Sequence, residues 1–566
     1  MDQVATYAGI PHVRQPRVSP DGGRVAYLSD ASGHYELSVT DGTDETRLTD
    51  GEPSPTPFAP ILWGPDGDRI YLAVGDDETD THPGVAALDG RVRRVVEASG
   101  RVFLWDVSPD GRFLWFFDRP EGDTALVRYD TETDARTEVP LEEFVHRGGG
   151  VAPSGDRIAF TDNPRAEPHG AVYVAAADGS DRRRLAVSDD PTFVWAWGPD
   201  GERLLVSDDF DGGRLGIHDV RSETTEWLDG PTGRITGVTF LPDGERVFVV
   251  RAGSAGVHDR STGTFRTLPV DGSVRLPPVV RDGAVFGEDA VLLARSSETN
   301  PGELLRYDLR TDEAASLVDT LPATLDRSAL VRGTEQTYPA ADGDASRALV
   351  YEPPTTPAPG VAVVYGATPD VSRRFDRLTQ LLVAEGYVVC HPAPTGDPFD
   401  DRQHAGFAAA GRWLADQSAV DGRVAAYGHS HGGYDAYVQA VRYPNVWDAA
   451  AAYNGWTDLP AVAESGGGGW VLRDNLPDYE THPGAWRAAS PITDADSLGV
   501  PLLMLHGRDD PIVPVSQARR FRDALDAAGV DRYDYHELPG GHGGGTDVEQ
   551  TVAAYERLVG FLDRQF

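Results

Sequence analysis

The sequence contains no lysine, a single cysteine and no long hydrophobic run, and each shortage excludes a class of protein. Cys390 has no partner for an intrachain disulfide, so the chain is not a disulfide-stabilised secreted scaffold. This cysteine closes the apolar run Tyr387–Val389, where we expect a buried and unreactive thiol. No segment has the length of a membrane span, and the first residues show neither a secretory signal nor an anchor, which favours a cytoplasmic location.

The missing lysine belongs to an extreme charge balance. All 51 basic residues are arginines, 90 residues are acidic, and the net charge is −39. Such a surface repels nucleic acid and anionic membranes, so neither is an expected partner. The composition resembles haloarchaeal proteins, whose molar-salt cytosol shortens the Debye length to about 3 Å and screens the repulsion. We therefore expect folding to require high salt. An acidic patch that recruits a basic partner fits less well, because the acids are spread along the whole chain.

A turn motif recurs through the first half of the chain, every 43 to 46 residues. In five copies a proline presets φ and Asp-Gly closes the turn, and an alternating strand such as Arg69–Val74 follows the turn. Several short strands per period of about 44 residues are typical of propeller blades. The copies lie at residues 19–22, 64–67, 108–111, 153–155, 198–201 and 241–244, with a weaker seventh at 286–289. We predict a seven-bladed β-propeller over residues 1–320, since a two-sheet sandwich would not keep so constant a period.

From about residue 326 the pattern changes, and strands alternate with longer helical stretches. This alternation indicates a parallel sheet covered by helices. The length of 566 residues also favours two domains. We therefore predict a second, α/β domain over residues 326–566. Its expected buried strands are Val361–Tyr365, Tyr387–Cys390, Arg423–Tyr427 and Leu502–Leu505.

The most informative motif is Gly428-His429-Ser430-His431-Gly432, which directly follows an expected strand. In a GxSxG elbow the serine occupies a sharp strand-to-helix turn, where a Cβ at either glycine would collide with backbone. Apolar residues continue after the motif at helical spacing, at Tyr434, Tyr437, Val438 and Val441. The pattern alone is common, and a glycine turn in a solvated loop is the alternative. The flanking strand and helix favour an α/β-hydrolase fold with Ser430 as the nucleophile.

A serine nucleophile needs a base and a carboxylate, which on this type of sheet follow it in the order Asp, His. Strand Leu502–Leu505 leads into a loop that contains Asp509 and Asp510, and this loop can present one carboxylate. The later segment 532–538 leads into His542, which stands alone among glycines. A histidine in that setting has little packing role, so catalysis is the favoured interpretation over a solvated loop histidine.

Together these motifs resemble the prolyl oligopeptidase family of serine peptidases, in particular its acylaminoacyl-peptidase and dipeptidyl-peptidase-like branch. The resemblance spans nearly the whole chain. It rests on the propeller repeats, residues 428–434, Ser490-Pro491, the HGxxDxxVP loop at 506–514, and Gly541-His542. It implies acyl transfer, in which Ser430 attacks a carbonyl, His542 moves the proton and Asp510, selected by the HGxxDxxVP spacing, holds the histidine tautomer. Neither a cofactor nor a metal is expected, since the remaining histidines show no ligand spacing.

The resemblance also implies donors for an oxyanion. The amide of His431, which follows the nucleophile, is one. The family's HGGP sequence is replaced here by Tyr365-Gly366-Ala367-Thr368-Pro369. Some relatives use a tyrosine hydroxyl at this place, so Tyr365 is our candidate, with Gly366 beside it. The alternative is a strand-end tyrosine that is simply packed.

The substrate is less defined than the chemistry. Several relatives hold a substrate carbonyl with an arginine two residues after the triad aspartate, but this chain has Ile512 there. Peptide anchoring must therefore differ, with Arg473 or Arg508 as substitutes. We expect a serine peptidase for short or N-acylated peptides, with the propeller limiting substrate size. The alternatives are an esterase that uses the same triad and a propeller binding protein with an inactive hydrolase domain. Homo-oligomerisation is left open.

Overall fold

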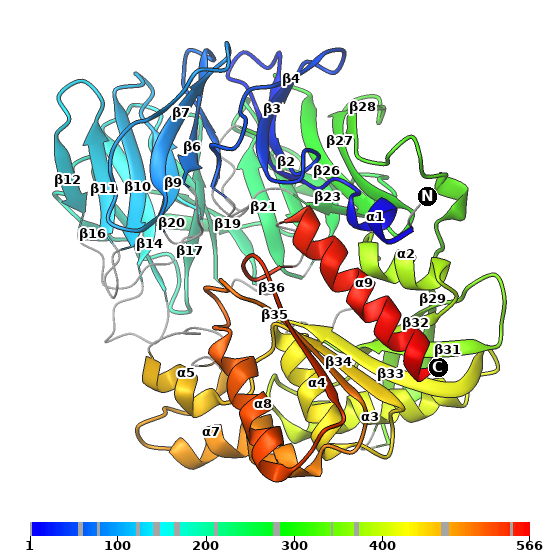
Figure 1. The fold of residues 1–566 in the computed structure, drawn as a ribbon. Helices are drawn as coiled ribbons and strands as arrows, with labels where there is room; N and C mark the ends of the chain where they lie inside the picture. Colours follow the sequence, from blue (N-terminus) through cyan, green and yellow to red (C-terminus); the bar gives the residue numbers. More distant parts are fainter. Residues whose placement is uncertain are drawn as a thin grey trace. The chain divides into compact units, whose positions relative to one another are not determined.

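The computed structural model divides the chain into two compact units, Pro11–Leu321 and Met1–Ile10 together with Pro322–Phe566. The predicted division assigned residues 1–10 to the first domain. They group with the second unit because helix α1 (Gln3–Ala8) packs against α2 (Arg377–Ala384) and α9 (Val548–Gln565) (Figure 1). The structure describes residues 3–54, 60–75, 80–119, 125–139, 148–162, 170–208, 213–231, 233–275, 283–340, 343–366, 373–465, 472, 475–543 and 547–566.

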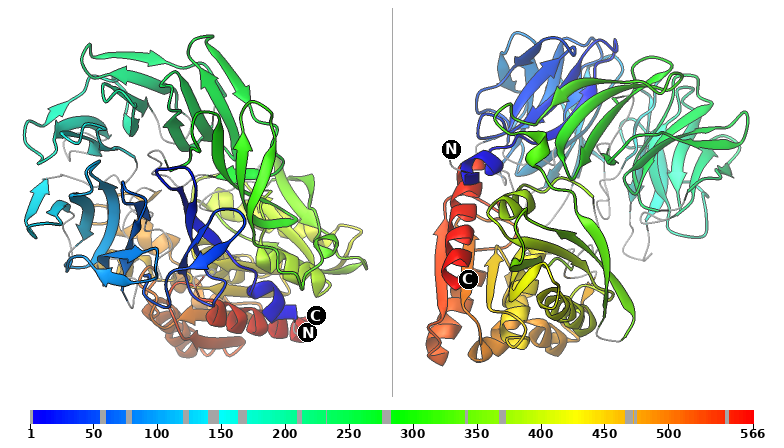
Figure 2. Two further views of the ribbon diagram at one scale, coloured as in Figure 1. Left: turned by 90° about the horizontal axis from the view of Figure 1, so that it is seen from above. Right: turned by 90° about the vertical axis from the view of Figure 1, so that its right-hand side faces the viewer.

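The described part of the first unit forms seven four-stranded antiparallel sheets, each with its strands in chain order. The sheets follow one another around a ring (Figure 2). Their strands are β1 (Val13–Val18), β2 (Val25–Ser29), β3 (Glu36–Thr40), β4 (Glu45–Arg47); β5 (Leu62–Trp63), β6 (Arg69–Val74), β7 (His82–Ala87), β8 (Val92–Arg94); β9 (Arg101–Val107), β10 (Phe113–Arg119), β11 (Ala125–Asp130), β12 (Arg136–Val139); β13 (Gly150–Val151), β14 (Arg157–Asp162), β15 (Ala171–Ala176), β16 (Arg183–Arg184); β17 (Phe193–Trp197), β18 (Arg203–Ser207), β19 (Leu215–Asp219), β20 (Thr224–Trp227); β21 (Ile235–Phe240), β22 (Arg246–Arg251), β23 (Ser254–Asp259), β24 (Thr264–Thr267); β25 (Ser273–Arg275), β26 (Ala290–Ser297), β27 (Asn300–Asp308) and β28 (Ala314–Asp319).

The repeated turns link the first and second strands of the blades, and their final glycines adopt positive φ, for example 69° at Gly22 and 68° at Gly67. Such left-handed backbone explains why glycine recurs there. Each blade shares a hydrophobic cluster with the next, and the last blade shares one with the first, which includes Tyr27 and Leu292. The ring is also joined by a hydrogen bond from the Val18 N–H to Gly283 O, at 2.8 Å. The predicted propeller is confirmed.

The second unit contains one eight-stranded sheet in the order β29-β30-β32-β31-β33-β34-β35-β36. The pairs β29–β30 and β30–β32 are antiparallel and the remaining pairs are parallel, which confirms the predicted α/β-hydrolase fold. The strands are β29 (Thr334–Pro339), β30 (Ala345–Tyr351), β31 (Ala358–Val363), β32 (Val388–Ala393), β33 (Val420–His429), β34 (Ala449–Tyr453), β35 (Leu502–Gly507) and β36 (Tyr533–Leu538). The further helices are α3 (Asp401–Ala415), α4 (His431–Arg442), α5 (Leu459–Ser465), α7 (Pro483–Ala489) and α8 (Ser516–Ala528), with 3₁₀ turns η1 (Arg327–Ala329) and η2 (Pro491–Ser497).

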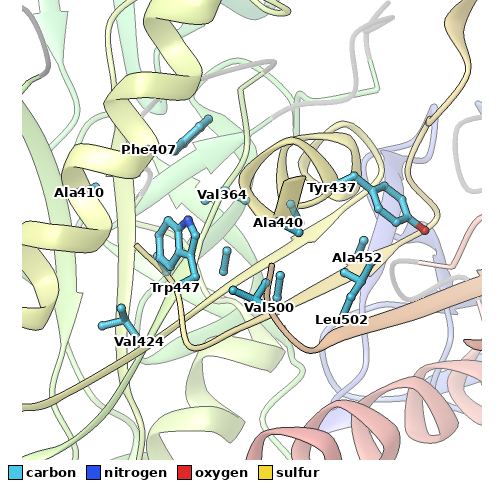
Figure 3. Packing of buried hydrophobic residues seen from close by; sticks show 14 of the residues in the cluster. Val364, Phe407, Ala410, Val424, Tyr437, Ala440, Trp447, Ala452, Val500 and Leu502 are labelled. Atoms are coloured by element: carbon cyan, nitrogen blue, oxygen red, sulfur yellow. The ribbon is translucent and has the colours of Figure 1, made fainter. Parts of the chain in front are cut away.

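The main core of this unit lies between one face of the sheet and helices α3, α4 and α8. Figure 3 shows part of this core, with Phe407 of α3 and Tyr437 of α4. Phe407, Tyr437 and Phe521 from these helices are fully buried against strand residues such as Ala452 and Leu502. Burying a side chain of this size contributes roughly 2 kcal/mol. Helix α9 packs on β34, β35 and β36, and α2 packs on β32.

Two further expectations concern the thiol of Cys390 and membrane-spanning segments. Cys390 is completely buried in β32, and burial raises the pKa of its thiol to about 12, so the thiol is unreactive at neutral pH. Among the helices in the described ranges, none combines the length and hydrophobicity that crossing a bilayer requires.

Candidate active site

Ser430 occupies a strained turn between β33 and α4. Its φ of 59° and ψ of −120° are unusual for a residue with a side chain, and such a conformation costs on the order of 1–3 kcal/mol. A Cβ on Gly428 would lie 1.9 Å from Gly432 O, and one on Gly432 would lie 2.2 Å from Val364 O. Both flanking glycines are therefore required by close backbone packing. The Ser430 N–H donates to Tyr453 O at 2.8 Å and fixes the turn against β34.

The three residues predicted as a triad are linked by hydrogen bonds in the structure. Ser430 Oγ lies 2.9 Å from His542 Nε2, and His542 Nδ1 lies 2.7 Å from Asp510 Oδ2. The three residues come from the carboxyl ends of β33, β36 and β35. Because an ionised carboxylate only accepts hydrogen bonds, the His542 proton sits on Nδ1 and leaves Nε2 to accept from the serine hydroxyl. This is the geometry that serine activation requires.

The loop after β35 distinguishes between its two aspartates. Asp510 is 6% exposed, and its Oδ1 accepts the N–H groups of Ile512 and Val513, both at 2.8 Å, which leaves Oδ2 directed at His542. The Nε2–H of buried His506 donates to Val513 O at 2.7 Å and supports the same turn. Asp509 is exposed. The carboxylate that meets the histidine is therefore that of Asp510.

The loop that contains His542 is joined to the Asp510 loop by main-chain bonds. The Arg508 N–H donates to Leu538 O at 2.8 Å, and the Asp509 N–H donates to Gly540 O at 3.0 Å. Side chains also hold the His542 loop. Gln550 Nε2 donates to Gly541 O at 3.0 Å, and His542 O accepts from His429 and from Asn454. None of these three side chains was predicted from the sequence to support the triad.

His431 begins α4 directly after the nucleophile. The first N–H groups of a helix have no intrahelical acceptor, so its amide is suitably placed to bind an oxyanion. Its side chain is only 2% exposed and lies edge-on to Phe399 and Trp456, with ring centroids 4.7 and 6.0 Å away. Burial lowers the pKa of this imidazole, so the ring is neutral and acts in packing.

Tyr365 and Gly366, the other proposed oxyanion residues, differ in whether their donor is already bonded. Tyr365 is 41% exposed, and its ring centroid lies 6.2 Å from that of His431, beside the elbow. Burial raises the pKa of its phenol, so the hydroxyl keeps its proton and can donate. The Gly366 N–H instead donates to buried Asp435 Oδ2 at 2.7 Å, so it is already engaged. Residues 367–369 lie outside the described residues.

The position at which several relatives have a substrate-anchoring arginine holds an apolar residue, Ile512. Ile512 packs at the margin of a cluster that includes Phe399, Trp456 and Val513. Arg508 is exposed and lies 3.6 Å from Glu537, and Arg473 falls outside the described residues. Within the described part of the chain, no three acidic, histidine or cysteine side chains are grouped in a way that could hold a metal ion.

Comparison with known proteins gives a family match over part of the chain and solved structures of the same fold. Residues 373–566 match the prolyl oligopeptidase family. Esterase LipQ from Mycobacterium tuberculosis is 35% identical over 135 residues, which cover 24% of this chain and 30% of the esterase. The chain thus spans under a third of that relative's length. A puromycin-hydrolyzing peptidase from M. tuberculosis has a TM-score of 0.82 at 20% identity, over 100% of this chain and 96% of that structure. Pyrococcus horikoshii acylaminoacyl peptidase has a TM-score of 0.73 at 16% identity, over 99% and 96%. These two structures share the fold of the chain described here.

Proposed function

We propose that the protein is a serine peptidase of the prolyl oligopeptidase type, which cleaves short or N-acylated peptides through an acyl-enzyme at Ser430. The observation that supports this most strongly is the continuous hydrogen-bonded chain from Ser430 Oγ through His542 to Asp510 Oδ2. The family match over residues 373–566 and the shared fold with two peptidases favour peptides as the substrate class.

The proposed reaction has two halves. In the first, His542 Nε2 takes the hydroxyl proton as Ser430 Oγ attacks the scissile carbonyl carbon. The resulting oxyanion accepts hydrogen bonds from the His431 amide and from the Tyr365 hydroxyl. The C–N bond then breaks, the amine leaves with the proton from His542, and an ester remains on Ser430. In the second half, water attacks this ester, His542 accepts a water proton and returns it to Ser430 Oγ, and the carboxylic acid is released.

The proposal also covers the size of the substrate, the location of the protein and its dependence on salt. The propeller, predicted over residues 1–320, limits the size of substrates that reach the catalytic domain over residues 326–566. The enzyme is cytoplasmic and of haloarchaeal type, with folding that depends on molar salt. The net charge of −39 supports this salt dependence and disfavours nucleic acid and membrane partners. Its stability should therefore rise with salt. Equal thermal melting in dilute buffer and in molar KCl would contradict the halophilic part of the proposal.

An esterase is the second candidate. Ile512 in place of an anchoring arginine, together with the local identity to esterase LipQ, favours it. A peptidase must expel a poor amine leaving group, whereas an esterase expels an alcohol. A panel of aminoacyl anilides, acyl-aminoacyl anilides and simple p-nitrophenyl esters, assayed in molar salt, separates the two. Turnover of the esters alone would favour the esterase.

The decisive experiment is labelling with a fluorophosphonate probe. We expect stoichiometric labelling of the unmodified protein and none of Ser430→Ala, with turnover lost in the same variant. Ser497→Ala is a matched control, because Ser497 is exposed at the end of η2. Labelling or turnover that persists in Ser430→Ala would overturn the mechanism. A protein that never reacts would instead support a propeller binding protein with an inactive hydrolase domain.

A further inference from the structure

The main-chain carbonyl of His542 is held by two side chains from neighbouring strands. His429 Nε2 lies 2.8 Å from His542 O, and Asn454 Nδ2 donates to the same oxygen. His429 is the last residue of β33, and Asn454 directly follows β34. Both donors therefore come from the carboxyl edge of the sheet that also presents Ser430.

Asn454 connects three strands at this edge. Its side-chain Oδ1 accepts the Gly507 N–H at 2.7 Å, and its own N–H donates to Leu505 O at 2.9 Å, both at the end of β35. The residue is fully buried and has a φ of 51°, a left-handed conformation that asparagine tolerates better than most residues. Asn454 thus forms hydrogen bonds both to β35, the strand before Asp510, and to the main-chain carbonyl of His542.

His429 bonds to the same carbonyl. Its ring contacts two others, with its centroid 5.2 Å from that of His542 and 4.9 Å from that of Tyr453. Since a carbonyl oxygen only accepts, Nε2 carries the proton. Burial, with a smaller contribution from His542, lowers the pKa of His429 to about 4, so this donor stays neutral at neutral pH.

The loop around His542 has a particular need for such support. Gly540 and Gly543 adopt φ values of 93° and 71°, and glycines of this kind leave a free loop many conformations. The imidazole must nevertheless meet Ser430 Oγ at 2.9 Å and Asp510 Oδ2 at 2.7 Å at once. A catalytic group displaced by about 1 Å loses on the order of 100-fold in rate.

We propose that His429 and Asn454 are positioning residues that fix the main chain of His542, so that its ring spans Ser430 and Asp510. They act through His542 and contact neither the substrate nor the reacting atoms. This inference rests on the proposed function, because it assigns these two side chains a part in the reactivity of Ser430.

The test compares variants by the kinetics of fluorophosphonate inactivation, which separate probe binding (KI) from the chemical step (kinact). His429→Phe keeps a ring against Tyr453 and removes the donor, whereas His429→Gln restores an N–H near the position of Nε2. Asn454→Asp suits the left-handed backbone and keeps the acceptor for Gly507, but it removes the donor to His542. Turnover of p-nitrophenyl acetate is measured alongside and expressed per site that the probe labels at completion.

We expect kinact and kcat to fall about 10- to 100-fold in His429→Phe and in Asn454→Asp, with KI and KM unchanged. His429→Gln should recover to within about threefold of the unmodified enzyme. A purely structural role would lower the labelled fraction or the melting temperature and leave kinact per labelled site intact, and that result would overturn the proposal. If His429→Phe fails to fold, Asn454→Asp alone decides between these outcomes. Absence of labelling in the unmodified protein would instead refute the proposed function itself.

Discussion

The two sides of the site around Ser430 are built differently. On the acid–base side, Asp510 and His542 are each held by several hydrogen bonds from main chain and side chains. On the oxyanion side, Tyr365 is 41% exposed and the Gly366 amide is directed at Asp435. The proposed acid–base residues are thus fixed by the loops that follow the strands, whereas the proposed oxyanion residues are held by fewer hydrogen bonds.

The largest effect should follow from removal of the carboxylate on the acid–base side. Asp510→Asn keeps the shape but can stabilise the wrong tautomer of His542, so we expect kcat to fall by about 10⁴-fold. Asp509→Asn is the matched control, because Asp509 is exposed on the same loop. Steady-state kinetics on a p-nitrophenyl ester measure both. Equal losses in the two variants would mean that the geometry at Asp510 is not the functional one.

The next prediction concerns the oxyanion side. Tyr365→Phe removes only the hydroxyl, and loss of one oxyanion donor should lower kcat by about 10²- to 10³-fold with little change in KM. Tyr533→Phe is a suitable control, since its hydroxyl bonds Asp526 on the surface. A change within about twofold would show that Tyr365 is only a packed residue at the end of a strand and that a different group completes the oxyanion site.

A smaller effect should follow from the residue behind Tyr365. Buried Asp435 accepts the Gly366 N–H at 2.7 Å and lies 3.4 Å from His404 Nε2, while Gln403 Nε2 donates to Gly366 O at 3.0 Å. Asp435→Asn keeps an acceptor but removes its charge, which weakens a bond of a kind that contributes about 1.5–3 kcal/mol. We expect kcat/KM to fall about tenfold as the segment that contains Tyr365 loosens. The rest of the lost free energy should lower the stability of the fold.

The control for Asp435→Asn is Asp401→Asn at the exposed start of α3. Thermal melting measured with the kinetics separates a local from a general effect. If Asp435→Asn left both the melting temperature and kcat/KM unchanged, the charge of Asp435 would have no role in holding the oxyanion side.

The same contrast explains what the sequence could and could not predict. Ser430 and His542 could be predicted from glycine requirements and from the order of residues along the chain, whereas the choice of Asp510 over Asp509 came from the family resemblance. Strand β34 was not predicted, because its run Ala449–Ala452 has low β propensity and is stabilised by burial between β33 and β35. Asn454 follows that strand and was therefore missed. Side chains that bond to a distant main-chain carbonyl, as His429 and Asn454 do, leave no spacing pattern in the sequence.

The smallest expected effect concerns His429 on the acid–base side. It is a change in how the stability of the fold depends on pH. Burial lowers the pKa of His429 to about 4, whereas an unfolded histidine titrates near 6.5. Between these values the unfolded chain binds more protons than the native one, so stability falls as the pH drops. At pH 5 this one group accounts for about 2 kcal/mol of the loss relative to neutral pH.

His429→Gln removes the titration, so its melting temperature should fall by a few degrees less than that of the unmodified protein between pH 7 and pH 5. Other buried histidines, including His431 and His506, titrate in the same direction and remain in both proteins, so the difference between the two isolates His429. Identical pH dependence in the two proteins would mean that folding does not lower the pKa of His429.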